Sequence, residues 1–522
     1  MYQKARRLNL GSTGRREFDN VRCAIIEAGY SITDQHPTAY FNTAVTLPHK
    51  AAFRRQLLRM ETPRSKGIVV FGGGTATNSL VDVLNDLRES RKCSLSYVIP
   101  ISDNGGSSSE LIRVFGGPGI GDIRSRLVRL IPDSESNEDL AATKALFNHR
   151  LSSDPEAARI EWLDIVEGRH VLWTQISSDK RELVRSIFNM VNMEIVKRAR
   201  PSSKFNFGRA AVGNMFLTGA RIFTGSLESS IYLLSQICSI PPATSVLPAI
   251  NTNFSHHISA GLSNGTVITG QNAISHPSEP TALPDANGTT TTDAAAISST
   301  EDTDAHDLIE DANWPGSLPT LRKQYIEFSK SGEDDLPSRI ERVWYINPYG
   351  HEIRPRANTK VIDSIEYANA VIYSIGSLYT SIVPSLVLRG VGNAIAHSGV
   401  RHKVLILNSS NDRETGPAAA PFTAVDFVSA IARACAESQG EFDKHPRAQE
   451  VRRYVTHLVH MEGDGTPKVD REALAKLEVD CIRVYGRRVN GDLRYDDQGL
   501  KAALEAVLGR TVMGRSRRNT KQ

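Results

Sequence analysis

Cysteine is scarce in this sequence, and its spacing suits neither a disulfide framework nor a metal site. The 522 residues include five cysteines, which are scattered without any C-x-x-C pair: Cys23, Cys93, Cys238, Cys435 and Cys481. Secreted disulfide scaffolds and zinc modules need closely and regularly spaced cysteines. The pattern therefore indicates reduced thiols in an intracellular protein.

Long apolar runs are missing as well. Residues 371–388 come closest to a membrane span, but serines, a threonine and a proline interrupt them, and a span needs about 20 mainly apolar residues. The N-terminus has basic residues but no apolar stretch behind them, so no secretory signal is visible. We expect a cytoplasmic protein with no membrane partner. A mitochondrial presequence stays open, although Glu17 and Asp19 count against it.

No excess of one charge sign is present. Lysine and arginine number 62 against 58 acidic residues, which gives a net charge of +4. Residues 509–522 form a basic tail without aromatic residues, and such a tail is typically solvated. The sequence therefore favours no specific nucleic-acid partner.

The chain divides by composition into four parts. Residues 1–65 form a moderately polar extension with one plausible helix at 51–60, and residues 66–486 carry an α/β pattern. A stretch rich in Pro, Ser, Ala, Asp and Thr, about 277–335, interrupts that pattern, and its composition predicts disorder. Residues 487–522 form a C-terminal segment that ends in the basic tail.

Between 66 and 486, short apolar β-rich runs alternate with segments of helical periodicity. We expect strands at 67–71, 97–101, 341–346, 370–375, 404–407, 454–459 and 481–485, and helices at 78–87, 143–151, 181–199, 212–223, 227–238, 360–368, from 382, and 422–436. This alternation predicts an α/β, Rossmann-like, doubly wound and mostly parallel sheet. Runs at 245–250, 256–260 and 266–269 predict a small antiparallel excursion with a turn at Asn264-Gly265.

The first expected strand runs directly into a glycine loop, Gly72-Gly73-Gly74-Thr75. A strand, a glycine turn and a helix N-terminus together form an anion site, because backbone N–H groups and the helix dipole attract phosphate. The dinucleotide fingerprint G-x-G-x-x-G is incomplete, since Thr77 stands at the third glycine position. The alternative is a tight turn without a ligand.

The second strand leads to Asp103, Asn104, Gly105, Gly106 and Ser107. Parallel strands deliver their carboxyl ends to one sheet edge, so this loop should lie beside the first. Asp103 could bind a cation or accept a proton from an attacking hydroxyl; alternatively, it caps the following helix. Asn104 could donate to a phosphate or satisfy a turn.

Further candidates for ligand binding follow along the chain: Arg124, Gly213, Asn214, Gly376, Ser377, Tyr379 and Thr380. Arg124 could grip a phosphate or brace its own loop against Asp122, for which a structural role is favoured. Gly213 and Asn214 could hold a base or only cap a helix. Gly376, Ser377 and Thr380 repeat the strand–glycine–helix pattern, whereas an aromatic such as Tyr379 is more often a core residue.

Five motifs in one order carry a resemblance to a known family. They are VVFGGGT at 69–75, SDNGGSS at 102–108 followed by PGIGDIR at 118–124, LFNHR at 146–150, VGNMFL at 212–217, and GSLYTSIVP at 376–384. With these motifs the chain resembles the family that joins the 2-phospho-L-lactate transferase CofD with the bacterial gluconeogenesis factor YvcK. The serine-rich second loop looks closer to YvcK.

The resemblance implies a Rossmann-like sheet that binds a nucleotide diphosphate compound or a nucleotide-sugar. In the CofD branch a phospho-acyl group moves from a guanosine diphosphate donor to an acceptor hydroxyl with magnesium, which implies catalytic roles for Asp103 and Asn104 and a metal role for Asp103. The YvcK branch implies a non-catalytic UDP-sugar regulator of carbon metabolism and cell shape. The family also suggests a homodimer. Asn104 stands where the family often has a second aspartate, which weakens magnesium binding.

Overall fold

The apolar run after Lys66 forms β1 (Ser65–Phe71), an interior strand of a seven-stranded sheet. The computed structural model describes residues 65–133, 137–200, 204–277, 318, 321, 335–397, 399–442 and 447–509. These residues belong to one compact unit that starts at Arg64. The helix expected at 51–60, nearly all of the expected disordered insert and nearly all of the basic tail lie outside the described residues.

The strand order β11-β10-β9-β8-β1-β2-β3 defines a doubly wound sheet in which every neighbouring pair is parallel. The other strands are β2 (Cys93–Ile99), β3 (Thr244–Pro248), β8 (Ala368–Tyr373), β9 (His402–Ile406), β10 (His457–His460) and β11 (Asp480–Arg483). The chain first winds outward from β1 to β3 and later from β8 to β11. The order therefore reverses between β1 and β8, which is the point where such sheets bind ligands.

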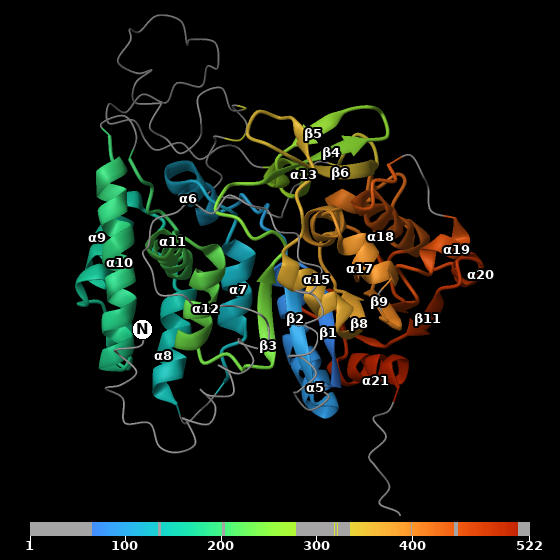
Figure 1. The fold of residues 1–522 in the computed structure, drawn as a ribbon, viewed down its shortest axis with the longest axis horizontal. Helices are drawn as coiled ribbons and strands as arrows, with labels where there is room; N and C mark the ends of the chain where they lie inside the picture. The colour runs from blue at the N-terminus through green and yellow to red at the C-terminus, as the bar shows by residue number, and fades with distance from the viewer. Residues whose placement is uncertain are drawn as a thin grey trace, which may run out of the picture. The chain divides into compact units, whose positions relative to one another are not determined.

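Helices connect and cover these strands (Figure 1). They are α4 (Thr75–Asn78), α5 (Val81–Arg91), α6 (Ser107–Phe115), α7 (Gly121–Arg129), α8 (Glu138–Asn148), α9 (Pro155–Glu167), α10 (Ser178–Arg198), α11 (Val212–Thr224), α12 (Leu227–Ile237), α13 (Gln271–Ser275), α15 (Thr359–Glu366), α16 (Val383–Leu386), α17 (Val391–His397), α18 (Ala424–Ser438), α19 (Ala448–Val451), α20 (Arg471–Lys476) and α21 (Asp497–Leu508), with short turns η1 (Val171–Trp173), η3 (Leu378–Ile382) and η4 (Arg413–Thr415). Among the described residues, no helix combines the length and apolarity that crossing a membrane requires.

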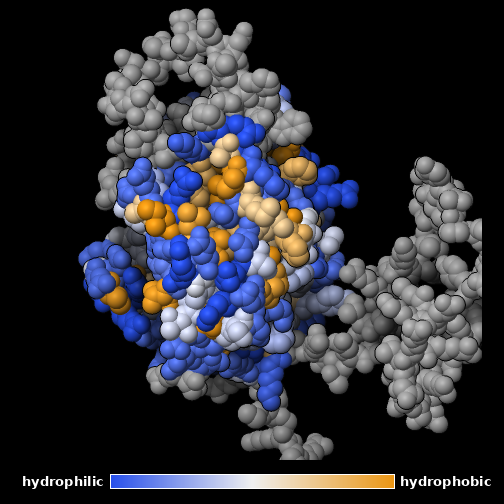
Figure 2. Space-filling view, turned by 90° about the vertical axis from the view of Figure 1, so that its left-hand side faces the viewer, coloured by the Kyte–Doolittle hydropathy of each residue, from blue (hydrophilic) through white to orange (hydrophobic). Residues whose placement is uncertain are grey.

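Helices α8 to α12 gather beyond the edge strand β3 (Figure 1). Their inner faces are apolar, with Trp162, Phe188 and Phe216 fully buried and in ring contact. Figure 2 looks onto this side, where hydrophobic groups form several patches between hydrophilic ones. Ile160, Val171, Met193 and Val196 are among the exposed apolar side chains of α9, η1 and α10. The homodimer stays a prediction.

A four-stranded antiparallel sheet, β5-β4-β6-β7, lies beside the carboxyl edge of the main sheet (Figure 1). It consists of β4 (His257–Leu262), β5 (Val267–Thr269), β6 (Ile340–Ile346) and β7 (Glu352–Ile353), with the predicted Asn264-Gly265 turn between the first two. Two strand assignments from the sequence were wrong. The run at 245–250 was expected in the antiparallel excursion, but β3 pairs parallel with β2. The run at 341–346 was expected in the main sheet, but β6 pairs antiparallel with β4.

The chain ends with a hairpin of β12 (Gly486–Val489) and β13 (Asp492–Tyr495), followed by α21. The phenol of Tyr495 is buried and donates to the carbonyls of Leu407 and Val459, at 2.7 and 3.1 Å. Helix α21 packs against α5, where Lys501 contacts Asp86 at 2.9 Å. These contacts fix the hairpin beside the carboxyl ends of β9 and β10.

Candidate functional site

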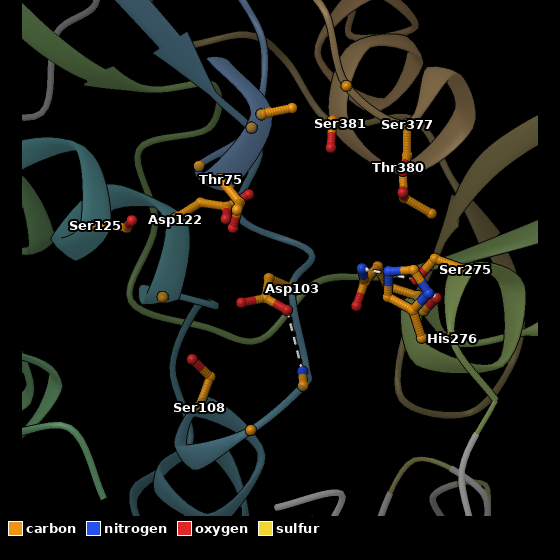
Figure 3. A pocket seen from close by; sticks show the side chains of 18 of the residues that line it. Thr75, Asp103, Ser108, Asp122, Ser125, Ser275, His276, Ser377, Thr380 and Ser381 are labelled. Atoms are coloured by element: carbon orange, nitrogen blue, oxygen red, sulfur yellow. Dashed lines mark hydrogen bonds between the residues drawn. The ribbon is translucent and has the colours of Figure 1, made fainter. Parts of the chain in front are cut away.

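A pocket of about 260 Å³ opens where the strand order reverses (Figure 3). One wall is the glycine loop after β1, a second is the Asp103 loop together with the start of α7, and a third is the loop after β8. Helix α13 of the small sheet closes the remaining side. The fold thus brings four segments, up to about 300 residues apart in sequence, around one polar cavity.

The first glycine loop holds a carboxylate of the protein itself. The backbone N–H of Gly74 donates to Asp122, at the start of α7. A Cβ atom at Gly73 would lie 2.8 Å from the Asp122 carboxylate and 2.7 Å from Ser381 Oγ, and one at Gly74 would collide with Asp122. Glycine is therefore favoured at both positions by close packing, and Asp122 accepts the Gly74 N–H.

Asp103 lies in the middle of the pocket, and Figure 3 shows that its side chain and that of Asp122 both border the cavity. Its Oδ1 accepts the N–H of Gly105 at 3.1 Å, and Gly106 rather than Asp103 is the N-cap of α6. Glycine is again required around it, because a Cβ atom at Gly121 would lie 2.6 Å from Asp103 Oδ2. The alternative of a helix cap is therefore not what the structure shows.

The two carboxylates influence each other. Burial and, to a smaller extent, the negative charge of Asp122 together raise the pKa of Asp103 to about 7. Burial also raises the pKa of Asp122, against the lowering effect of the Gly74 hydrogen bond. A pair of acidic side chains with raised pKa values can share a proton or hold a cation near neutral pH.

Two guanidinium groups face these carboxylates. Arg124, on α7, is buried and hydrogen bonds to Asn214 Oδ1 at 3.3 Å and to Asn148 Oδ1 at 3.4 Å. Burial and the positive charge of Arg150 lower the pKa of Arg124 to about 10, so it stays cationic at pH 7. Asn214 also donates to Ser107 Oγ at 3.0 Å, which ties α11 to the start of α6. The arrangement offers positive charge to an anion in the pocket.

Asn104 points away from this cavity. It is buried, and its Oδ1 accepts the N–H of Asn272 on α13 at 3.0 Å. Its contact joins the Asp103 loop to the small antiparallel sheet, while Asn272, Ser275 and His276 themselves line the pocket. Asn104 therefore positions the α13 wall, a long-range contact that is neither of the two roles considered from the sequence.

The loop after β8 is braced by an internal acid. Glu414 Oε2 accepts the N–H groups of Tyr379 and Thr380 at 2.8 and 3.0 Å, and Oε1 accepts the Thr380 hydroxyl at 2.5 Å. Burial raises the pKa of Glu414 to about 8, with a further contribution from Asp412. The N–H groups that a bound phosphate would use at Tyr379 and Thr380 already have an acceptor.

Most of the residues proposed from the sequence meet in this pocket. Those that line it are Gly73, Gly74, Thr75, Asp103, Gly105, Gly106, Ser107, Arg124, Asn214, Gly376, Ser377 and Thr380. Gly72 packs behind it against Thr77, and Gly213 packs where a Cβ atom would lie 2.6 Å from the Phe147 carbonyl. Tyr379 is buried, donates to the Ile340 carbonyl at 3.0 Å and contacts the Phe422 ring.

Sequence reasoning missed other lining residues. Arg150 falls within the helix expected at 143–151, but it follows the end of α8 and lines the pocket. Helix α13 also lines the pocket, and no helix was expected there. Asp122, for which the sequence favoured a structural role, accepts the Gly74 N–H and also lines the cavity. The motif GDIR carried a usable signal, because an acid in the first turn of a helix behind a glycine loop faces the same edge.

A second polar cluster supports the segment of Arg150 from behind. His149 Nε2 lies 2.6 Å from Glu161 Oε1, and the other oxygen of Glu161 accepts the Ser152 N–H at 2.8 Å. His170 is near enough to complete a three-ligand metal group. However, its Nδ1 accepts the Leu172 N–H, so neutral His170 carries its proton on the Nε2 that would bind the metal. The cluster is better explained as a hydrogen-bonded brace.

Most of this chain matches known proteins in sequence. The family described as 2-phospho-L-lactate transferase CofD matches residues 68–486. A Saccharomyces cerevisiae protein, "Uncharacterized protein YNL011C", is 38% identical over 433 residues, which cover 80% of this chain and 95% of that protein.

Two bacterial proteins are more distant. A protein of Halalkalibacterium halodurans named "Gluconeogenesis factor" is 21% identical over 374 residues, 71% of this chain and 74% of that protein. The crystal structure of a UPF0052 family member from Bacillus halodurans is 20% identical, with a TM-score of 0.49 over 85% of this chain and all of the other. By the extent of the family match, this chain belongs to the CofD family.

Proposed function

We propose that the pocket binds the diphosphate of a nucleotide compound and that the protein transfers a phospho-acyl group from it to an acceptor hydroxyl. The observation that carries this proposal is the pairing of Asp103 with Asp122 opposite Arg124 and Arg150, all lining one cavity at the point where the strand order reverses. Phosphoryl transfer needs an arrangement of this kind, with fixed positive charge for the phosphates and an acid–base group for the acceptor.

The roles follow from the geometry. Arg124 and Arg150 would bind phosphate oxygens, together with backbone N–H groups at the start of α6. Asp103, with a pKa of about 7, would accept the proton of the acceptor hydroxyl. The acceptor oxygen forms a bond to phosphorus, the bond between the two phosphates breaks, and the nucleoside monophosphate leaves with the electron pair.

Magnesium fits the residues present. Two adjacent carboxylates, Asp103 and Asp122, are the oxygen ligands that this ion prefers, and each has a raised pKa that a cation would lower. When bound, the ion would neutralise phosphate charge.

The second candidate function is a nucleotide-sugar regulator without turnover. One observation favours it: residue 104 is an asparagine whose side-chain oxygen already accepts the Asn272 N–H, so the second loop supplies the single carboxylate of Asp103. The relative named "Gluconeogenesis factor" agrees with this alternative.

Mass spectrometry of the small molecules that copurify with the full chain, followed by calorimetry with GDP and UDP-N-acetylglucosamine with and without Mg²⁺, tests both functions. A transferase should bind a guanosine diphosphate compound, and Asp103→Asn should spare donor binding while abolishing release of the monophosphate. Asp133→Asn, at an exposed acid outside the pocket, is the matched control. Specific binding of UDP-N-acetylglucosamine without turnover would identify the regulator, and no binding of either compound would refute both functions.

A further inference from the structure

A larger chamber, of about 1000 Å³, adjoins the site pocket. The two cavities share the wall formed by Thr75, Ala76, His276, Ile375, Gly376 and Ser377. The site pocket, at about 260 Å³, is small beside the roughly 300–1,000 Å³ typical of ligand sites. It can hold a diphosphate, but a nucleotide compound together with a second reactant needs the adjoining space.

The C-terminal hairpin builds the far wall of this chamber. Seven residues of the hairpin line the chamber: Arg487, Arg488, Gly491, Asp492, Leu493, Arg494 and Tyr495. The hairpin is held close to the sheet, since a Cβ atom at Gly486 would lie 2.6 Å from Met461 Sδ and 2.8 Å from Leu493. The family match ends at residue 486, so this wall lies beyond the part of the chain that defines the family.

The register of the hairpin puts two positive charges side by side. Arg487 and Arg494 are directly opposite each other in the antiparallel pair β12–β13, and both line the chamber. Like charges in this position repel. Their protein partners are distant: Arg487 lies 3.6 Å from Asp497, and Arg494 lies 4.0 Å from Asp492, with all four side chains more than half exposed. Exposed pairs at such distances contribute little.

An oxyanion between the two guanidinium groups would remove this repulsion and could accept two hydrogen bonds from each fork. The four aspartates of the chamber restrict where such an anion can bind. Asp412 accepts bonds from Thr415, Asp492 and Asp497 lie beside the arginines, and Asp464 also lines the space. Arg487 and Arg494 lie directly opposite each other in the hairpin and both line the chamber, so a negative group between them would offset both charges.

We infer that Arg487 and Arg494 form a binding site for a phosphate or carboxylate group on a second ligand, whose other end reaches the glycine loops through the shared wall. In the transferase this ligand is an acidic acceptor, with its hydroxyl near Asp103 and its anionic group at the hairpin. That assignment rests on the proposed function of the site pocket. The binding of an anionic group at the hairpin does not depend on that proposed function.

Arginine labelling of the full chain tests the site directly. Phenylglyoxal modification is followed by peptide mass spectrometry, with glycerol 3-phosphate as the phosphate probe and succinate as the carboxylate probe. At about ten times its Kd, a bound probe should slow the labelling of Arg487 and Arg494 about tenfold. Arg471 and Arg483, which contact Glu462 outside the chamber, should be labelled at unchanged rates.

Variants separate this site from the nucleotide pocket. The double variant Arg487→Gln/Arg494→Gln should lose probe binding in calorimetry and keep the affinity for GDP, whereas Arg471→Gln/Arg483→Gln should change neither. Absence of protection by both probes, or equal protection at all four arginines, would overturn the inference. If the wild type fails to bind GDP, the proposed function fails while the labelling result stands. If the double variant loses GDP affinity and no probe protects, the arginines belong to the nucleotide site.

Discussion

Replacing Asp103 with asparagine should stabilise the ligand-free protein above pH 7 while abolishing turnover. Asparagine has nearly the same shape, and its oxygen can still accept the Gly105 N–H that Asp103 accepts at 3.1 Å. What the substitution removes is the cost of an ionised carboxylate in a pocket that already contains Asp122. Stability and function should therefore respond in opposite directions, as expected for a residue kept for its chemistry.

The magnitude follows from the pKa. Asp103 has a pKa of about 7 in the folded protein against an ordinary value of 3.8, and each unit corresponds to about 1.36 kcal/mol. The ionised form thus costs up to ~4 kcal/mol. Because the side chain is partly open to the pocket and its water, we expect about half of this, ~2 kcal/mol.

The pH range is set by the same two values. The pKa of Asp103 is higher in the folded state than in the unfolded state, so the folded state binds more protons between about pH 4 and pH 7. The free energy of unfolding of the wild type therefore decreases as the pH rises through this range. The gain from Asp103→Asn should be near zero below pH 4 and complete above pH 7.

Thermal unfolding of the ligand-free wild type and variant at a series of pH values measures this difference. Because the unfolding entropy scales with the size of the compact unit Arg64–Gln522, 1 kcal/mol shifts its Tm by roughly 1 °C, and the variant should melt roughly 2 °C higher at pH 8. Asp133→Asn is the control with the opposite sign, because its bond to Lys144 lowers the pKa of Asp133. A variant that melts at or below the wild-type temperature at pH 8 would refute the reasoning that burial and Asp122 raise the pKa of Asp103.

Three other substitutions test the walls of the site and the attachment of the hairpin. Gly74→Ala would drive a methyl group into Asp122 and should cost about 1–3 kcal/mol in urea unfolding, together with nucleotide affinity in calorimetry. Glu414→Ala would leave the N–H groups of Tyr379 and Thr380 without their acceptor and should cost about 1–3 kcal/mol in the same assay; Glu414→Gln should cost less. Tyr495→Phe removes both phenol hydrogen bonds and should cost about 1 kcal/mol and speed proteolysis of the hairpin.

Local patterns in the sequence were sufficient for most of the sheet. Strands β1, β8 and β9 are short apolar runs bounded by polar residues or glycine, and buried parallel strands have this pattern. Local sequence patterns do not, however, indicate which of the two sheets a short strand joins. β3 and β6 are both short runs with buried apolar positions, although β6 also carries exposed Glu341 and half-buried Arg342. The pairing of β3 with β2 and of β6 with β4 assigns them to different sheets.

Part of the site was equally accessible from the sequence. Glycine loops directly after expected strands place Gly74, Asp103 and Ser377 at one sheet edge, because the carboxyl ends of parallel strands meet there. Arg150 and α13 could not be found in this way. Arg150 follows a helix rather than a strand, and α13 arrives with the small antiparallel sheet, whose position depends on packing between distant segments.

The sequence by itself determined the α/β class, the glycine loops and the family, because each is encoded in contiguous residues with a characteristic spacing. The tertiary structure decided which groups face one another. It set Asp122 against Gly74, turned Asn104 toward Asn272, and placed Glu414 under Thr380. The physical reason is that a side chain's charge state and partners depend on its burial and on neighbours remote in sequence. Both are fixed only when the strands, loops and helices have packed together.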